Sequence, residues 1–174
     1  MYLLRGAPKG DGPVVRLIGS GPIMVQVLDA VEKLETYGVR AEIYSATSYG
    51  ELRREGLDCD RHNRLHPTDD LQKPWVETLL SEPISTVAVS DNMAAVPDMI
   101  RQWVSGPYTV LGTDGFGRSD TREALRRFFE IDGAAIALAA LSSLVREGKV
   151  DAKVYAKAEK NFAVSTDRPD IAGL

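Results

Sequence analysis

The chain has 174 residues, enough for one domain that would bury roughly 70% of the surface of its unfolded chain. Its net charge of -4 argues against nucleic acid and against an acidic membrane surface as partners, because phosphate binding needs a basic patch. No apolar run approaches the roughly 20 residues of a membrane span, and a lone Cys59 builds no disulfide framework, so a reducing, cytoplasmic setting is expected.

The first elements along the chain are two strands and a helix. Residues 1–4 are apolar and residues 14–18 are a predicted strand. The turn-rich connection between them is too short for a crossover, which predicts a hairpin-like antiparallel entry. Pro22 then stands where a helix begins. Apolar side chains recur at helical spacing from Ile23 to Leu34, and Gly38 ends this helix.

The middle of the chain alternates strands and helices. Strands are predicted over residues 41–45, 84–89 and 108–111, and helices over 48–57, 75–80 and 94–104, the last with Ile100 and Trp103 facing inward. Residues 58–74 are polar, contain both histidines and are predicted to be irregular.

After a glycine-rich loop, the last part of the chain is helical. Asp120 or Ser119 is predicted to cap an amphipathic helix, residues 134–145 form a helix that is apolar nearly all round, and Asp151 caps a final helix through residue 160. Residues 165–174 are predicted to be a flexible tail. The domain is therefore expected to comprise residues 1–164.

The connections between successive strands are far too long for hairpins, which favours parallel pairing with helices on both faces. We expect a three-layer α/β/α fold with a mostly parallel sheet of about five strands and one antiparallel edge strand.

Two glycine-containing segments invite a phosphate-binding interpretation. Gly10-Asp11-Gly12 resembles the start of a diphosphate-binding motif whose aspartate holds magnesium, but no asparagine follows at the required distance, so we expect a turn. Gly19-Ser20-Gly21 joins a strand to a helix, yet it lacks the third glycine and the acidic partner of a dinucleotide site. A tight strand-to-helix turn is the expected role of this second segment.

Cys59, His62 and His66 have a spacing that would allow metal ligation on one helix. The irregular segment expected here and the absence of paired ligand spacing argue against a metal site. We expect His66 to lie instead in a polar loop at a domain or subunit contact.

The densest polar group on the loop after residue 111 comprises Asp114, Arg118, Asp120 and Arg122. Alternating aspartate and arginine permit bidentate bonds that stiffen a loop, and ligand sites of α/β sheets lie at carboxyl ends of strands. The residues leave both readings open, a self-bonded structural loop or a ligand or subunit contact. No nucleophile stands beside a recognisable base, so we assign no catalytic, cofactor-binding or metal-ligating residue.

Four segments resemble one family in the same order: residues 17–21 (LIGSG), 44–52 (YSATSYGEL), 63–67 (NRLHP) and 112–120 (GTDGFGRSD). The family is that of the thiamine-diphosphate-dependent pyruvate dehydrogenases of the homodimeric bacterial type, and the similar region is their C-terminal domain, which has the transketolase C-terminal fold. The resemblance covers almost the whole chain.

The resemblance implies a complete enzyme that decarboxylates pyruvate on thiamine diphosphate and magnesium and passes the acetyl group to the lipoyl group of the dihydrolipoyl acyltransferase. It implies that the cofactor lies between two other domains, that none binds in this chain, and that this domain supports homodimer assembly. The isolated chain is then expected to be inactive and to be part of a longer protein.

Three alternatives remain open from the residues. A transketolase or deoxyxylulose-phosphate synthase would share the fold. A free-standing interaction module of the same fold would bind a partner without being part of the enzyme. An independent small enzyme or nucleotide-binding protein would use the loop at Gly19 or at Asp114.

Overall fold

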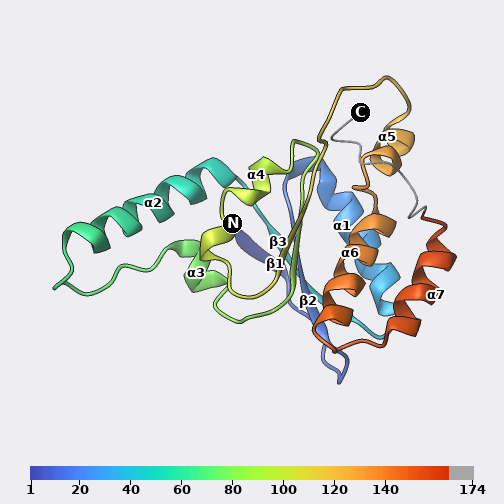
Figure 1. Ribbon diagram of the computed structural model, residues 1–174, viewed down its shortest axis with the longest axis horizontal. Helices are drawn as coiled ribbons and strands as arrows, with labels where there is room; N and C mark the ends of the chain where they lie inside the picture. The colour runs from blue at the N-terminus through green and yellow to red at the C-terminus, as the bar shows by residue number, and fades with distance from the viewer. Residues whose placement is uncertain (165–174) are drawn as a thin grey trace.

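The computed structural model describes residues 1–164 as one sheet covered on both faces by helices (Figure 1). The expected tail, residues 165–174, lies outside the described residues. The strands are β1 (Tyr2–Arg5), β2 (Val14–Gly19), β3 (Arg40–Ser45), β4 (Thr86–Val89) and β5 (Tyr108–Leu111). The helices are α1 (Met24–Glu35), α2 (Tyr49–Leu65), α3 (Trp75–Leu79), α4 (Ala95–Asp98), α5 (Arg122–Phe128), α6 (Gly133–Arg146) and α7 (Ala152–Phe162), with 3-10 turns η1 (Gly21–Ile23) and η2 (Arg101–Trp103).

The sheet has the strand order β1-β3-β2-β4-β5. Strands β2, β3, β4 and β5 pair in parallel, and β1 pairs antiparallel with β3 at the edge, which confirms the expected sheet type. The hairpin-like pairing of the first two strands was wrong, because β3 lies between them. The connection from β1 to β2 is instead fixed on the start of β3, where Arg40 Nε donates to the carbonyl oxygen of Gly12 at 2.7 Å.

Alternation along the strands assigns side chains to two separate cores. Val15 and Leu17 of β2 belong to one buried cluster, together with Val87 and Val89 of β4. Ile18 of β2 belongs to the cluster on the other face. The sheet is therefore buried on both sides, as parallel sheets generally are.

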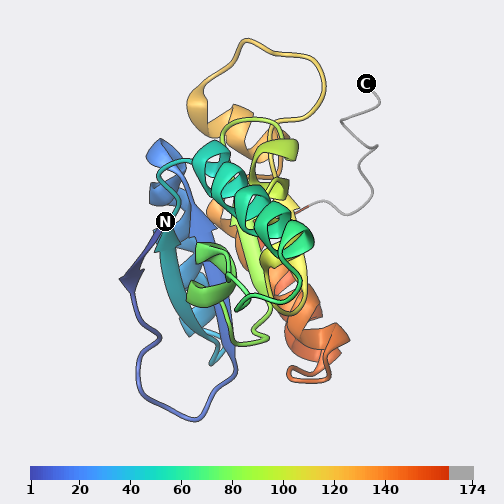
Figure 2. The ribbon, with the colours of Figure 1, turned by 90° about the vertical axis from the view of Figure 1, so that its left-hand side faces the viewer.

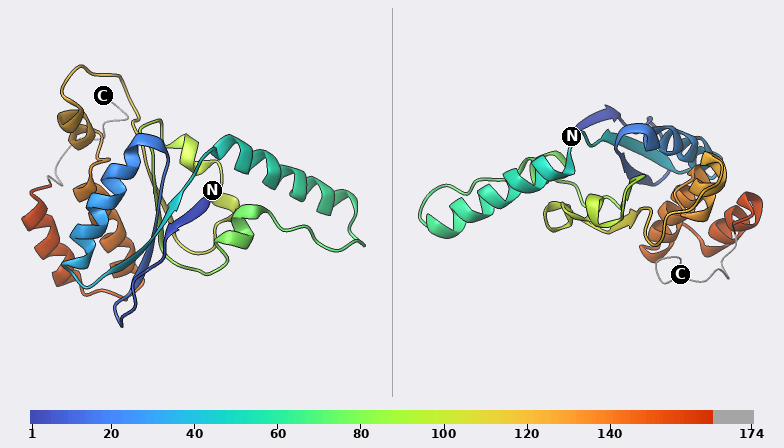
Figure 3. Two further views of the ribbon diagram at one scale, coloured as in Figure 1. Left: turned by 180° about the vertical axis from the view of Figure 1, so that it is seen from behind. Right: turned by 90° about the horizontal axis from the view of Figure 1, so that it is seen from above.

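Helices α1, α6 and α7 cover the first face, and α2, α3 and α4 cover the second (Figures 1 and 3). Helices α1 and α6 pack closely because small residues line the contact. A Cβ atom added to Gly133 would lie 2.0 Å from Oδ2 of Asp29, and Gln26 Oε1 accepts the Gly133 N–H at 3.0 Å. Asp132 and Asp151 cap α6 and α7, the latter as the sequence predicts.

Helix α2 is longer than expected and runs to Leu65, so residues 58–65 are helical and not irregular. Gly56 lies inside this helix. The indole of Trp103 occupies the space that a side chain at position 56 would need, so glycine allows the ring to pack against the helix. Trp103 Nε1 then donates to the carboxylate of Asp60 at 3.1 Å. The far end of α2 projects beyond the sheet as an arm (Figure 3), and Figure 2 shows the helix crossing in front of the strands.

The helix expected over residues 94–104 is broken into α4 and η2. Pro97 fits only the first turn of a helix, and the chain leaves helical geometry at Ile100 (φ -105°, ψ 0°). Ile100 and Trp103 are nevertheless buried, as the sequence predicts.

One charged pair joins the neighbouring strands β2 and β3. Arg16 of β2 is 2% exposed, and its Nε lies 2.6 Å from Oε1 of Glu42 on β3. The ring of Tyr44 lies 5.5 Å from the same guanidinium group. Since each charge has its partner, this buried pair is compatible with a stable sheet.

The stretch Arg122–Arg146 reaches the length and apolar character of a membrane-spanning helix. It comprises two helices separated at Glu130, which has a φ of 57°, and 61% of its most apolar window is buried inside the domain. These features are those of a core helix of a globular domain, and this stretch is weak evidence for a membrane span.

Candidate functional site

The loop that follows β5 begins with a firm attachment to the loop that follows β4. The N–H of Thr113 donates to the carbonyl oxygen of Asn92 at 3.0 Å. The carboxylate of Asp114 accepts the N–H of Ala94 at 3.0 Å. A Cβ atom added to Gly112 would lie 2.3 Å from the backbone nitrogen of Ala94. Asp114 is therefore a structural residue that joins two loops at the carboxyl edge of the sheet.

The second half of the same loop, residues 115–120, is exposed. Phe116 is 82% exposed, and Gly115 has a φ of +92° that favours glycine. The guanidinium carbon of Arg118 lies 4.2 Å from the centroid of the Phe128 ring, a cation–π distance.

The charged residues of this loop are not bonded to one another. Among residues 1–164, no ion pair links Asp114, Arg118, Asp120 and Arg122. Asp120 accepts the N–H of Thr121 at 2.7 Å. Of the two interpretations that the sequence leaves open, the contacts do not show the self-bonded loop, because Arg118 stacks on an aromatic ring and the two aspartates accept backbone N–H groups.

Thr121 caps α5, and its hydroxyl oxygen accepts the N–H of Ala124 at 3.2 Å. The prediction that Asp120 or Ser119 caps this helix was wrong by one or two residues. Thr121 has the extended backbone of a cap (φ -62°, ψ 152°) and lies three residues before the N–H that it binds.

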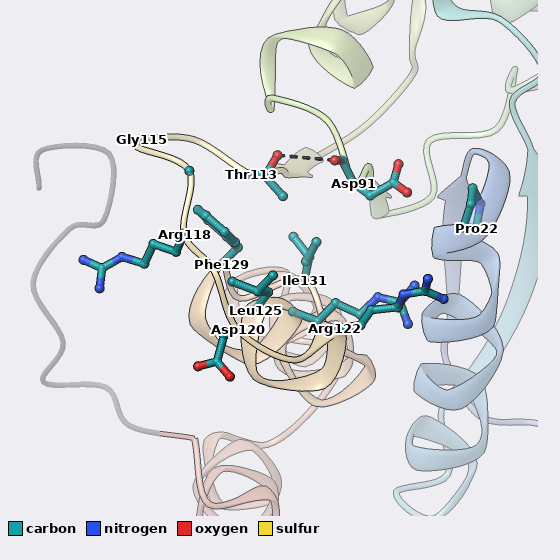
Figure 4. A pocket seen from close by; sticks show the side chains of 12 residues that line it. Pro22, Asp91, Thr113, Gly115, Arg118, Asp120, Arg122, Leu125, Phe129 and Ile131 are labelled. Atoms are coloured by element: carbon teal, nitrogen blue, oxygen red, sulfur yellow. Dashed lines mark hydrogen bonds between the residues drawn. The ribbon is translucent and has the colours of Figure 1, made fainter.

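A pocket of about 540 Å³ opens between this loop, α5 and the turn η1 that precedes α1 (Figure 4). Its apolar lining includes Leu125, Phe129 and Ile131, of which the last two are 9% and 2% exposed. Its polar lining includes Arg122 and Arg126 of α5 and Asp91 of the loop after β4. An adjoining hollow of about 480 Å³ between α1 and α5 is lined by the same two arginines.

Of the predicted group, Arg118, Asp120 and Arg122 line this pocket, and Asp114 supports the loop beneath it. Sequence reasoning missed Arg126 and Asp91. Arg126 could have been found from its position four residues after Arg122, on the same helix face. Asp91 could have been found as a residue directly after a buried strand.

His66 lies apart from this pocket, at the end of α2 on the opposite layer (Figure 1). Its Nδ1 lies 3.9 Å from Oδ2 of Asp69, and its ring centroid lies 4.7 Å from that of His62. Residue 66 is more than half exposed. The structure therefore does not bring His66 together with the loop residues.

Cys59 and the histidines do not form a metal site. Among the described residues, no three or more His, Cys, Asp or Glu side chains are grouped so that they could hold a metal ion. Burial, and then the carboxylate of Glu55, raises the pKa of the Cys59 thiol, which donates to Glu55 Oε1 at 3.5 Å. A protonated, buried thiol of this kind is a poor nucleophile.

The two glycine segments have structural roles in the described chain. Gly12 lies at the amino edge of the parallel strands, opposite the pocket, where an added Cβ would be 2.0 Å from the carbonyl oxygen of Gly38. An added Cβ at Gly19 would lie 2.6 Å from Sδ of Met24 and 2.9 Å from the side chain of Val27. Gly19 is thus required for the tight turn from β2 into the following helix.

Bacterial pyruvate dehydrogenase E1 components are similar to almost the whole chain. The pyruvate dehydrogenase E1 component of Mycolicibacterium smegmatis is 42% identical over 100% of this chain and 19% of its own length. The same component of Escherichia coli is 41% identical over 92% of this chain and 18% of its own length. The component of Haemophilus influenzae is 46% identical over 92% of this chain and 18% of its own length. The chain thus spans less than a fifth of the length of these bacterial relatives.

Solved structures share the fold at low sequence identity. A transketolase from Pichia stipitis in complex with sedoheptulose 7-phosphate superimposes with a TM-score of 0.56 at 15% identity, over 84% of this chain and 18% of its own. A split-gene transketolase, described as an inactive β4 tetramer, superimposes with a TM-score of 0.52 over 83% of this chain and 42% of its own.

The resemblance seen in the sequence is therefore confirmed. The family described as the transketolase-like TK C-terminal domain matches residues 1–132, which contain the whole sheet and the pocket. The chain belongs to this transketolase-like C-terminal domain family.

Proposed function

We propose that this chain is the C-terminal domain of a pyruvate dehydrogenase E1 component. The whole enzyme oxidatively decarboxylates pyruvate and transfers the acetyl group to the lipoyl group of the dihydrolipoyl acyltransferase. One observation carries this proposal. Identity with these three pyruvate dehydrogenase components is 41–46% over 92% or more of the chain, whereas identity with transketolases of the same fold is 15–20%.

The alternative, the equivalent domain of a transketolase-type enzyme, has weaker support. It rests on the shared fold, and a fold hosts many activities. The match to the M. smegmatis component runs over 100% of this chain and therefore includes its surface loops, such as the exposed residues 115–120. Loops of this kind vary most between enzymes of different function.

The thiamine diphosphate and magnesium of the whole enzyme are proposed to bind outside this chain. The described residues do not fit a bound diphosphate with its metal ion. Gly10-Asp11-Gly12 lies in the turn between β1 and β2, against Arg40 and Gly38. Among residues 1–164, it belongs to no group of three or more His, Cys, Asp or Glu side chains that could hold a metal ion. We therefore derive no chemical step from residues of this chain, and we propose that the isolated chain is inactive.

The role left to this domain is assembly of the cytoplasmic homodimer and contact with the other domains. The loop after β5 and the arm formed by the far end of α2 present surface for such contacts. The contact residues that we propose on these two segments are Asp114, Arg118, Asp120, Arg122 and His66. The inactive tetrameric state named for the split-gene transketolase supports the idea that a piece of such an enzyme assembles without activity.

The decisive experiment isolates the native protein with an antibody against residues 1–164. We expect a polypeptide about five times the 19.0 kDa of this chain, because the chain covers 19% of its M. smegmatis relative. We also expect pyruvate-dependent acetyl transfer that requires thiamine diphosphate and magnesium. A native polypeptide of 19.0 kDa without this activity would contradict the proposal and support a free-standing interaction module.

A further inference from the structure

The pocket after β5 lies where the topology of the sheet places ligand sites. In the strand order β1-β3-β2-β4-β5, β3 lies on one side of β2 and β4 lies on its other side. The direction in which the chain adds strands to the sheet therefore reverses between β2 and β4. Crevices of α/β sheets form at such a switch point, outside the carboxyl ends of the strands. Pro22 follows β2, Asp91 follows β4 and Thr113 follows β5, and all three line the pocket (Figure 4).

Two guanidinium groups in this pocket have no acidic partner. Among residues 1–164, no hydrogen bond or ion pair is formed by the side chain of Arg122 or of Arg126. The neighbouring arginines are engaged elsewhere. The guanidinium group of Arg118 stacks on the ring of Phe128, and Arg127 Nε lies 3.4 Å from Asp132. Arg122 and Arg126 are four residues apart, so that both project from one face of α5.

The remaining walls limit what the cavity can accept. Leu125, Phe129 and Ile131 provide an apolar surface beneath the arginines, which suits the carbon skeleton of a small molecule. Asp91, across the cavity from α5, can accept hydrogen bonds from hydroxyl groups. The volume of about 540 Å³ lies in the usual range for small-molecule sites.

We propose that this pocket binds a small organic phosphate with a hydroxyl-bearing carbon skeleton, such as a sugar phosphate or a nucleoside monophosphate. A phosphate monoester carries close to two negative charges and matches two guanidinium groups, each of which can bind two of its oxygens. The hydroxyl groups donate to Asp91, and the apolar surface contacts the skeleton. This inference does not depend on the proposed function, because it concerns the described chain by itself.

Calorimetric titration of the protein tests the site with ribose 5-phosphate, adenosine monophosphate and inorganic phosphate, beside unphosphorylated ribose and adenosine. We expect saturable binding of the two organic phosphates and none of ribose or adenosine. Arg122→Gln and Arg126→Gln should each weaken this binding about tenfold or more. Arg53→Gln, an exposed arginine on α2, is the matched control and should leave binding unchanged.

Asp91→Asn separates recognition of the skeleton from recognition of the phosphate. It should weaken ribose 5-phosphate and should not weaken inorganic phosphate. Thermal melting of each variant verifies that it is folded, which we expect because Arg122 and Asp91 are exposed. Absence of saturable binding of every phosphorylated probe would overturn the proposal. So would binding that is equal in the wild type and in both α5 variants.

Discussion

Gly56 allows a sharp test of the packing between α2 and Trp103 of η2. Glycine within a helix usually costs about 0.5–1 kcal/mol relative to alanine, so Gly→Ala at an unobstructed site stabilises. At Gly56 the added Cβ would lie 2.5, 2.6 and 2.7 Å from three atoms of the Trp103 indole. The ring is 6% exposed and is held by its bond to Asp60, so it cannot move aside freely.

We therefore expect the sign of the effect to be reversed. Ordinary contact between carbon atoms is about 3.5–4.0 Å, so the ring or the helix must shift by roughly 1 Å. Overpacking of this size costs about 1–3 kcal/mol, which exceeds the gain in helix propensity. Gly56→Ala should lower the free energy of unfolding and lower the melting temperature by about 2–4 °C for each kcal/mol.

Gly50, in the first turn of the same helix, is the matched control. An added Cβ there would meet only Oγ of Ser48, at 3.9 Å. Gly50→Ala should leave stability unchanged or raise it. Urea unfolding followed by circular dichroism gives both values, and the slope should be the same in all three proteins. A Gly56→Ala variant as stable as the wild type would refute the proposed packing of α2 on Trp103.

Three further changes test individual contacts. Arg118→Ala should lower stability by about 0.5–1 kcal/mol without preventing folding, since it removes an exposed cation–π contact; an unchanged melting curve would instead favour an interface role. Asp114→Ala should cost roughly 1–3 kcal/mol in urea unfolding, because a backbone N–H loses its acceptor. Burial would raise the Glu147 pKa, but hydrogen bonds from Ser85 and Lys149 lower it below the ordinary 4.5. The contribution of ionised Glu147 to the free energy of unfolding is therefore complete above pH 4.5 and is lost as the pH falls through the lowered pKa. Glu147→Gln should flatten this part of the curve of stability against pH.

The order of elements could be predicted because short-range patterns specify it. Apolar runs such as residues 84–89 and helical spacing from Ile23 to Leu34 identify the strands and helices, and Asp151 identifies the start of α7. The long connections then favour parallel pairing. The pairing of β1 with β3 could not be predicted, because it depends on where the first connection crosses the start of β3.

The sequence predicts where the loop of the candidate site lies, but it does not predict the contacts of that loop. The loop after residue 111 does lie at the carboxyl edge, where α/β sheets place ligands. Its charged residues do not bind one another, because their partners come from other elements. Asp114 binds the backbone of Ala94, and Arg118 stacks on Phe128. Such partners are invisible in the local pattern.

The fold class and the family could be predicted from the sequence, because both depend on local periodicity and on segments that keep their order along the chain. The length of α2 and the composition of the pocket depend on tertiary packing, which local patterns do not show. Helix α2 continues past its predicted end at residue 57, and Gly56 within it leaves room for the indole of Trp103. Arg126 and Asp91 become neighbours of one cavity only after the strands β4 and β5 pair, since packing between distant segments decides which side chains meet.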